Sequence, residues 1–207
     1  MLICSPVAVA AAASAQDTIG ILDQVNGAAQ IDRDGQTLNA TSSMALKLHD
    51  KVDAKLGASV SIALGGGARL TLAESSTIVI DNQSFANQHG GFLINLSTGL
   101  VRASVVSEPS ATVSGFEVHT PNAIAIAHGT EFAITYIANK ACPDAPGCRR
   151  YTDVSVYKGI VEVINPTDAK NQRVRVQQGY ETAVPCEFSP TSPAPIGMNE
   201  LGAPGYQ

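Results

Sequence analysis

The chain has 207 residues, of which 44% are hydrophobic and only 15% are charged. A chain of this length and composition folds around a hydrophobic core, and it has too few charged residues for a coiled coil or a charged disordered segment. Its 13 basic and 18 acidic side chains give a formal net charge of −5, and it contains no Trp. These values argue against a nucleic-acid partner, because nucleic-acid binders carry basic surfaces and aromatic platforms for stacking.

The N-terminal residues 2–15 form an apolar stretch that closes with the small triplet Ala-Ser-Ala. This pattern is typical of the core and cleavage site of a secretory signal, here without the usual basic leading segment. We therefore predict a signal peptide over residues 1–15 and a mature chain that starts at Gln16, in the periplasm or secreted. No later stretch reaches the roughly 18 consecutive apolar residues of a membrane-spanning helix, so no transmembrane segment is expected.

Alternation of apolar and polar residues dominates from residue 19 to residue 184, in short segments separated by Gly, Asn, Asp and Pro. The pattern predicts an all-β protein, with a single helical turn over residues 42–48 as the one helix candidate. Glycine precedes a strand at intervals of 30, 30 and 20 residues, which favours a twisted β-solenoid-like stack with glycine corners. The four glycines are Gly99, Gly129, Gly159 and Gly179.

The domain organisation follows from the same patterns. We expect one all-β domain over residues 16–185, because the alternation runs without a linker-like break. Residues 186–207 are rich in Pro and Gly and sparsely charged, so they predict a flexible tail.

Three cysteines follow the predicted signal. Cys142 and Cys148 bracket a loop of two prolines and a glycine, and in an oxidising compartment they are the first candidates for a disulfide. A zinc site is the alternative, although their spacing is longer than that of the usual zinc knuckle. Cys186 is then either left over or the true partner of one of the other two.

The remaining motifs argue against catalysis and against a cofactor. The sequence has no G-x-S-x-G elbow, no phosphate-binding loop and no dinucleotide fingerprint. Glu117 and Glu131 are the acids of the most distinctive region, but the sequence does not place them across a cleft as a glycosidase requires. The four histidines lack the spacing of a helical metal site, so we predict no metal, no cofactor and no enzyme activity.

Basic residues are concentrated in one 27-residue stretch. They form either a solvated surface or a docking face for an acidic partner, such as a protein or an anionic envelope polymer. The six residues are Arg149, Arg150, Lys158, Lys170, Arg173 and Arg175.

Three segments carry a resemblance to a known family. Residues 46–81 resemble the opening of the FecR domain, residues 116–132 resemble its "thr-pro … arg-gly-thr-glu-phe" block, and residues 154–163 resemble its closing strand pair. They occur in the family's order and cover about residues 46–164. The signature residues are Thr120, Pro121, Gly129, Thr130, Glu131 and Phe132, and we interpret all six as architectural.

Three positions depart from the family pattern. His49 stands at a usual glycine, Gly66 stands in the asp-gly turn, and His128 replaces the usual arginine. The first two are tolerable turn variants, whereas the third removes a fixed positive charge.

The resemblance implies a periplasmic all-β domain. Signalling members of the family join this domain to a cytoplasmic anti-sigma segment and a membrane helix, which this sequence is not expected to contain. The leading hypothesis is therefore a stand-alone, non-enzymatic FecR-domain protein that binds or scaffolds envelope proteins. A sensor of iron or metal uptake that works with a separate membrane protein is the second hypothesis, and an envelope glycan binder or enzyme is the third. Self-association and the identity of any small-molecule ligand stay open.

Overall fold

The computed structural model describes residues 18–84, 90–106, 115–142 and 145–197. The predicted signal peptide over residues 1–15 lies outside these ranges. Within them the protein is almost entirely β-structure, with one 3-10 turn at Gly65–Gly67. In this part of the chain we find no helix that is long and apolar enough to cross a bilayer.

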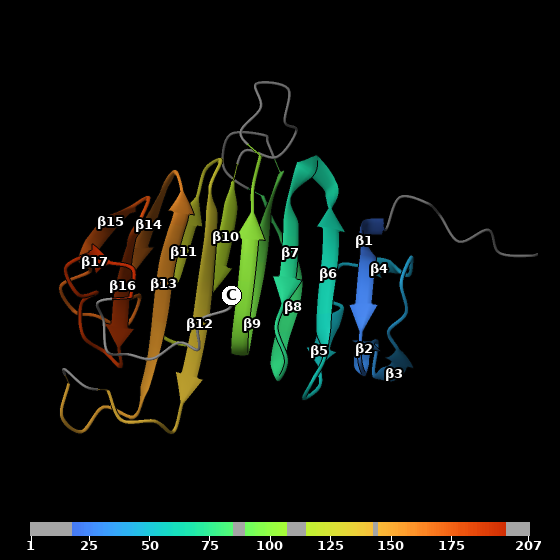
Figure 1. Ribbon diagram of the computed structural model, residues 1–207, viewed down its shortest axis with the longest axis horizontal. Coiled ribbons are helices and arrows are strands. Elements are labelled where there is room, and N and C mark those ends of the chain that lie inside the picture. The colour runs from blue at the N-terminus through green and yellow to red at the C-terminus, as the bar shows by residue number, and fades with distance from the viewer. Residues whose placement is uncertain (1–17, 85–89, 107–114, 143–144, 198–207) are drawn as a thin grey trace, which may run out of the picture.

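The strands form one open, 17-stranded sheet that lies in two layers (Figure 1). Layer 1 has the order β4 (Ala45–Lys47), β1 (Thr18–Asn26), β6 (Ser59–Leu64), β7 (Arg69–Leu72), β9 (Gly90–Ser104), β12 (Glu131–Ala138), β13 (Arg150–Lys158), β16 (Tyr180–Pro185) and β17 (Ala194–Pro195). Layer 2 has the order β3 (Gln36–Asn39), β2 (Ala29–Arg33), β5 (Lys51–Ala54), β8 (Ser76–Ser84), β9, β10 (Phe116–His119), β11 (Ile124–Ala127), β14 (Ile160–Ile164) and β15 (Arg173–Gln177).

Strand β9 belongs to both layers. Its first half pairs with β8 and β10, and its second half, from Gly99 onward, pairs with β7 and β12. Gly99 has a φ of 87°, and a Cβ there would lie 2.3 Å from the Ser76 hydroxyl oxygen. Glycine is therefore required where the strand passes from one layer to the other. Among the described strands every pairing is antiparallel except that of β9 with β10.

The core lies between the two layers, as the alternation predicts. Buried and less buried side chains alternate in strands such as β6, β7 and β14, and one cluster of buried residues runs from Leu22 to Val184. The rings of Phe116 in layer 2 and Phe132 in layer 1 meet edge to face with centroids 6.5 Å apart. Burial of such side chains contributes about 25 cal/mol per Å² of apolar surface, so this shared core is the main stabilising feature of the fold.

The four glycines predicted as corners all have positive φ, between 63° and 87°. Gly159 also makes a close approach, because a Cβ at this position would lie 2.9 Å from the Thr130 methyl group. The prediction of conformationally required glycines is confirmed at Gly99, Gly129, Gly159 and Gly179.

The structure differs from the sequence-based expectation at residues 42–48. This segment contains strand β4 instead of a helical turn, because Leu46 is fully buried and pairs with Gly20 of β1. Ser43, proposed as part of the turn, has a φ of 68° and donates its N–H to the Leu22 carbonyl. Tertiary pairing outweighs the local capping signal here.

The segment after Pro185 is attached to the sheet as far as residue 197. Strand β17 pairs with Tyr180 and Glu181, and the Thr191 N–H donates to the Ala183 carbonyl. The Asn165 side chain donates to the carbonyl oxygens of Cys186 and Phe188, at 2.8 and 2.7 Å. These contacts join residues 186–197 to the sheet, and the Pro- and Gly-rich composition that predicts a flexible tail from residue 186 does not reveal such distant partners.

Candidate functional site

The Thr-Pro part of the signature forms a buried turn between β10 and β11. The Thr120 Oγ1 accepts the Ala123 N–H at 2.9 Å and lies 2.7 Å from the Thr152 hydroxyl. Thr152 donates to the Asn122 side chain, which in turn donates to a backbone carbonyl of β16 at 2.6 Å. These groups satisfy one another in the core, so Thr120 stabilises the fold.

The Gly-Thr-Glu-Phe part of the signature is also structural. Gly129 supplies a φ of 63°, the buried Thr130 packs against Gly159, and the Thr130 carbonyl accepts the Val105 N–H. Phe132 is fully buried in the core. The Thr130 hydroxyl has no hydrogen-bond partner among the described residues. The block therefore fixes a corner where β12 begins beside the β13–β14 turn.

The two glutamates of this region lie in different layers. Glu131 of layer 1 accepts hydrogen bonds from Arg102, at 2.5 and 3.1 Å, and the Arg102 guanidinium lies 4.6 Å from the centre of the Tyr157 ring. Glu117 of layer 2 lies 2.7 Å from the His119 Nε2. Because each acid has its own partner in its own layer, the two do not form the carboxylate pair of a glycosidase.

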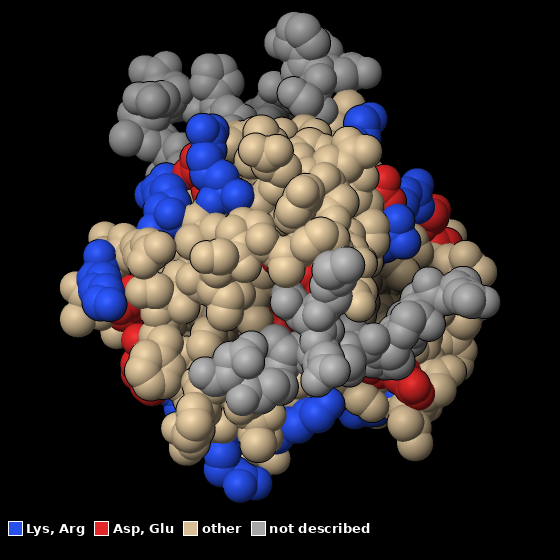
Figure 2. All heavy atoms as spheres, turned by 60° about the vertical axis from the view of Figure 1, so that its left-hand side comes forward, with Lys and Arg blue, Asp and Glu red and all other residues tan. Residues whose placement is uncertain are grey.

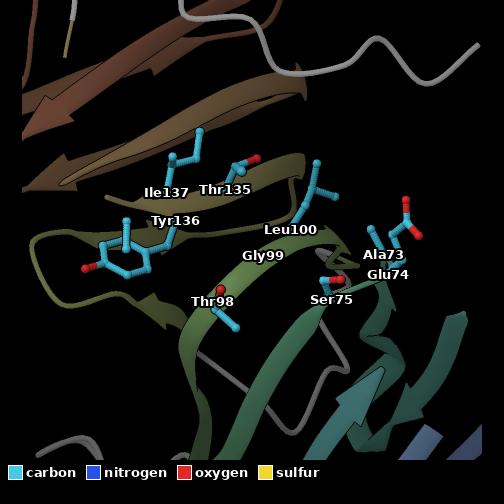
Figure 3. A pocket seen from close by; sticks show the side chains of 10 residues that line it. Ala73, Glu74, Ser75, Thr98, Gly99, Leu100, Thr135, Tyr136 and Ile137 are labelled. Atoms are coloured by element: carbon cyan, nitrogen blue, oxygen red, sulfur yellow. The ribbon is translucent and has the colours of Figure 1, made fainter. Parts of the chain in front are cut away.

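A shallow groove of about 330 Å³ lies near the bend of β9 (Figure 3). Residues 73–75, 98–100 and 135–138 line it. Glu74 and Tyr136 lie on opposite sides of the view, and the Glu74 carboxylate accepts the Gly57 N–H at 2.5 Å. Glu74 is the single carboxylate among the lining residues, and a backbone group already binds it. The groove therefore has no acid–base pair for catalysis.

The cysteines pair differently from the sequence-based expectation. The disulfide joins Cys148 to Cys186, with Cα atoms 5.8 Å apart, and Cys142 is a buried free thiol. The prediction of a Cys142–Cys148 bond is therefore wrong for this structure, because the end of β16 pairs with β13 and brings Cys186 beside Cys148. The three sulfurs lie within 4.8 Å of one another and, in the described part of the chain, form the single group of three potential metal ligands.

Asp153 and Tyr151, which the sequence analysis did not single out, lie on β13 near these cysteines. Burial raises the pKa of Asp153 from 3.8 to about 7; the Glu181 charge adds to this shift and Lys140 opposes it. Burial also raises the pKa of Tyr151. Neither the Asp153 Oδ2 nor the Tyr151 hydroxyl has a hydrogen-bond partner in the described ranges. An aspartate at an outward position of a strand normally indicates exposure, so the sequence carried no signal for this burial.

The six basic residues do not gather in one place. Arg173 and Arg175 on β15 both contact Glu162, at 2.6 and 3.2 Å. Arg150 pairs with Glu187 at the start of β13, whereas Lys158 lies at the opposite end of this strand. Arg149 donates to the Asn139 carbonyl, and Lys170 lies in the β14–β15 connection. Figure 2 shows the end of the molecule that contains strands β13 to β17. Basic side chains are distributed over its surface, with acidic side chains beside several of them.

Exposed apolar side chains occur on two neighbouring turns at the same end. Tyr157 and Ile160 flank the β13–β14 turn, and Tyr180 follows the β15–β16 turn; they are 40%, 44% and 41% exposed. The Gly179 N–H donates to the Val156 carbonyl at 2.8 Å, which holds the two turns together. We call Tyr157, Lys158, Ile160, Arg175 and Tyr180 the apolar rim. Arg175 belongs to it because it lies directly opposite Glu162 in the pairing of β14 with β15. Glu162 lies two residues from Ile160, on the same face of β14.

The fold and the signature define an all-β domain with an architectural signature and an exposed apolar rim. The family model described as "FecR protein" matches residues 50–162, which is more than half of the 207 residues. The chain therefore belongs to the FecR family, as the resemblance predicted.

Two solved structures have the same fold. Both are crystal structures described as a "putative anti-sigma factor" from Parabacteroides distasonis ATCC 8503, at 1.65 and 2.50 Å resolution. Each is 17% identical to this chain with a TM-score of 0.51, and the match covers 70% of this chain and 59% of the other. At this identity the likeness concerns the fold alone. No curated protein matches the sequence.

Proposed function

We propose that this chain is a non-enzymatic, periplasmic protein-binding module that regulates or scaffolds a signalling system of the bacterial envelope. The proposal rests on the observation that five of the six signature residues have a structural role. Thr120, Gly129, Thr130 and Phe132 all serve turns or packing, and Glu131 is paired with Arg102. Such a domain has surface for a partner, and its signature residues form no constellation for catalysis.

Membership in the FecR family and the likeness to an anti-sigma factor fold support a regulatory role. A periplasmic location agrees with the signal-like residues 1–15. The signal would reach the cell interior through a separate membrane protein. We also propose that the fold is solenoid-like, because its glycine corners recur along the chain and each hairpin extends a layer.

The apolar rim is the binding surface in this proposal. Tyr and Arg are enriched at the energetic centres of protein interfaces, and Tyr157 is already oriented by the Arg102 guanidinium. Lys158 and Arg175 flank the apolar side chains, so an apolar protein segment with acidic neighbours fits this surface. Arg173 would extend the same attraction along β15.

A capture experiment with matched variants tests the proposal. The mature protein, the triple variant Tyr157→Ser/Ile160→Ser/Tyr180→Ser and the control Leu56→Ser are immobilised and exposed to envelope extract of the source bacterium. Leu56 is 82% exposed and lies between β5 and β6, away from the rim. We expect wild type and Leu56→Ser to retain the same anti-sigma or transporter protein and the triple variant to lose it.

Two outcomes would contradict the proposal. Equal recovery by all three proteins would exclude the rim as the binding surface. Recovery of only the chain itself or of cell-wall polymer would exclude a signalling role. Higher salt should weaken the expected complex, since Lys158 and Arg175 attract the partner through charge.

A further inference from the structure

Three cysteine sulfurs meet in one buried cluster outside the apolar rim. Cys148 and Cys186 form a disulfide, Cys142 carries a free thiol, and the three Sγ atoms lie within 4.8 Å of one another. A thiolate attacks a disulfide sulfur when the two meet at close range. The cluster therefore holds a potential nucleophile and its electrophile side by side.

The backbone around the cluster is held without help from the disulfide. The Cys142 N–H donates to the Cys148 carbonyl at 3.1 Å, and the Cys148 N–H donates to the Ala145 carbonyl at 3.0 Å. The Cys186 N–H donates to the Arg150 carbonyl at 3.0 Å. Because these bonds fix all three cysteine backbones, a change of sulfur partner needs mainly side-chain rotation.

Three clustered sulfurs also resemble the donor set of a soft metal ion, which would bind them as thiolates. The groups around the three sulfurs disfavour the thiolate form. The Arg150 carbonyl oxygen lies 3.4 Å from the Cys142 Sγ and 2.9 Å from the Cys148 Sγ, and a carbonyl oxygen repels a thiolate. Burial raises the pKa of the Cys142 thiol; a backbone hydrogen bond with Arg150 opposes this shift, and the nearby Asp153 charge adds to it. The site therefore favours a thiol beside a disulfide over three thiolates around a metal.

We propose that this cluster is a thiol–disulfide exchange site in which Cys148 changes its partner from Cys186 to Cys142. The Cys142 thiol releases its proton to solvent, and its sulfur attacks the Cys148 sulfur. The Cys142–Cys148 bond forms as the Cys148–Cys186 bond breaks. The electron pair of the broken bond goes to the Cys186 sulfur, which then takes up a proton. One thiol and one disulfide are present before and after, so the step needs no oxidant or reductant.

The exchange changes which segments of the chain the disulfide joins. The bond to Cys186 spans 38 residues and fastens the segment 186–197 to the loop before β13. A bond between Cys142 and Cys148 closes only a short loop and constrains the unfolded chain less. After exchange the segment is held by hydrogen bonds alone, such as those from Asn165 and to Ala183.

Trapping of free thiols tests the exchange directly. The oxidised full chain, with Cys4→Ser in every sample, is incubated anaerobically at mildly alkaline pH without added thiol. It is then denatured in acid, alkylated and mapped by mass spectrometry. We expect label at Cys186 at least about tenfold above the background of the control Cys142→Ser, which has no attacking thiol. The rate should not depend on protein concentration, because the attack is intramolecular.

Several results would overturn the proposal. Label that stays on Cys142 alone shows that no exchange occurs, and label on Cys148 shows that Cys186 is the shared sulfur. A rate that rises with protein concentration shows exchange between molecules. Retention of one zinc ion per chain, after reduction by a dithiol, zinc loading and dialysis, would make the cluster a metal site.

The variant Cys186→Ser isolates the second pairing without relying on the equilibrium. Oxidised by a small disulfide, it should form the Cys142–Cys148 bond, and residues 186–197 should exchange amide hydrogens faster than in Cys142→Ser. If Cys186→Ser remains reduced under conditions that oxidise Cys142→Ser, the second pairing is inaccessible and the proposal fails.

Discussion

Two aspartates near opposite ends of the stack differ in how their charge is balanced. Asp50, at the start of β5, is 1% exposed and accepts hydrogen bonds from Arg33 at 2.8 and 2.6 Å and from the Lys47 N–H at 2.8 Å. Asp153, in the middle of β13, leaves its Oδ2 without a hydrogen-bond partner in the described ranges, and burial raises its pKa to about 7. Asp50 raises the pKa of Arg33 chiefly through their hydrogen bond.

The difference shows what a carboxyl group does where it is fully buried, as at Asp50, and where it is half-buried, as at Asp153. Asp50 joins β2 to the β4–β5 turn, so its charge contributes to the fold. Asp153 faces Thr135 of β12 and Ala183 of β16, close to the cysteine cluster, and its ionisation costs stability. The first region has a complete electrostatic network, whereas the second holds a carboxyl group whose charged form the fold does not stabilise.

Removing the paired aspartate should have the largest effect. Asp50→Ala removes the carboxylate that accepts from Arg33 and from the Lys47 N–H and leaves the Arg33 guanidinium with the Ala45 carbonyl alone, so we expect a loss of about 3–5 kcal/mol in the free energy of unfolding. Urea denaturation measures it, with the exposed Asp32→Ala as the control, for which a change within about 0.5 kcal/mol is expected. Equal, small effects of both variants would remove the basis of the comparison.

Substitutions at Gly159 and Gly179 test whether the region around Asp153 is loosely packed. Gly159→Ala adds a Cβ 2.9 Å from Thr130 at a φ of 81°, whereas Gly179→Ala adds one at a φ of 83° with nothing within 4 Å. We expect a loss of about 2–3 kcal/mol for Gly159→Ala and about 1 kcal/mol for Gly179→Ala, measured from urea midpoints. Similar losses of stability in the two variants would indicate that the structure around Gly159 adjusts to the added Cβ. In that case this region is loosely packed, and the missing hydrogen-bond partner of Asp153 would reflect that packing.

Neutralising the unpaired aspartate should stabilise the protein. Between about pH 4 and about 7 the folded chain keeps a proton on Asp153 that the unfolded chain has released, so the free energy of unfolding falls as the pH rises. Asp153→Asn removes this fall and should stabilise the protein by on the order of 2 kcal/mol at about pH 8. Thermal unfolding across this pH range measures the effect. The control Asp32→Asn should keep the wild-type pH dependence, and an unchanged profile in Asp153→Asn would refute the assignment.

Substitution of His49, the residue before Asp50, should have the smallest effect on the free energy of unfolding. His49 has a φ of 67° at a position where the family has glycine, and its Nδ1 lies 2.5 Å from the Asp81 carboxylate. His49→Gly relieves the backbone strain and loses the exposed contact with Asp81, so we expect a net gain of about 0.5 kcal/mol. The control His49→Ala loses the pair but keeps the strain, and it should be less stable than His49→Gly in the same urea titration. A more stable His49→Ala would show that the strain is unimportant.

The β-class, the family and the conformational role of particular residues can be predicted from the order of residues along the chain. Val and Ile at every second position predict buried faces of strands, and Gly99, Gly129 and Gly159 stand where φ must be positive. Phe132 belongs to the core for the same reason. These properties depend on periodicity and on the conformations that one residue allows, so they are readable along the chain.

The tertiary structure alone decided which distant groups meet. Cys186 reaches Cys148 because β16 pairs with β13, and the same pairing places Asp153 in a partly closed environment. The apolar rim likewise depends on the bond between Gly179 and Val156. Strand order and register determine these contacts, and no local pattern specifies them because the partners are separated by tens of residues.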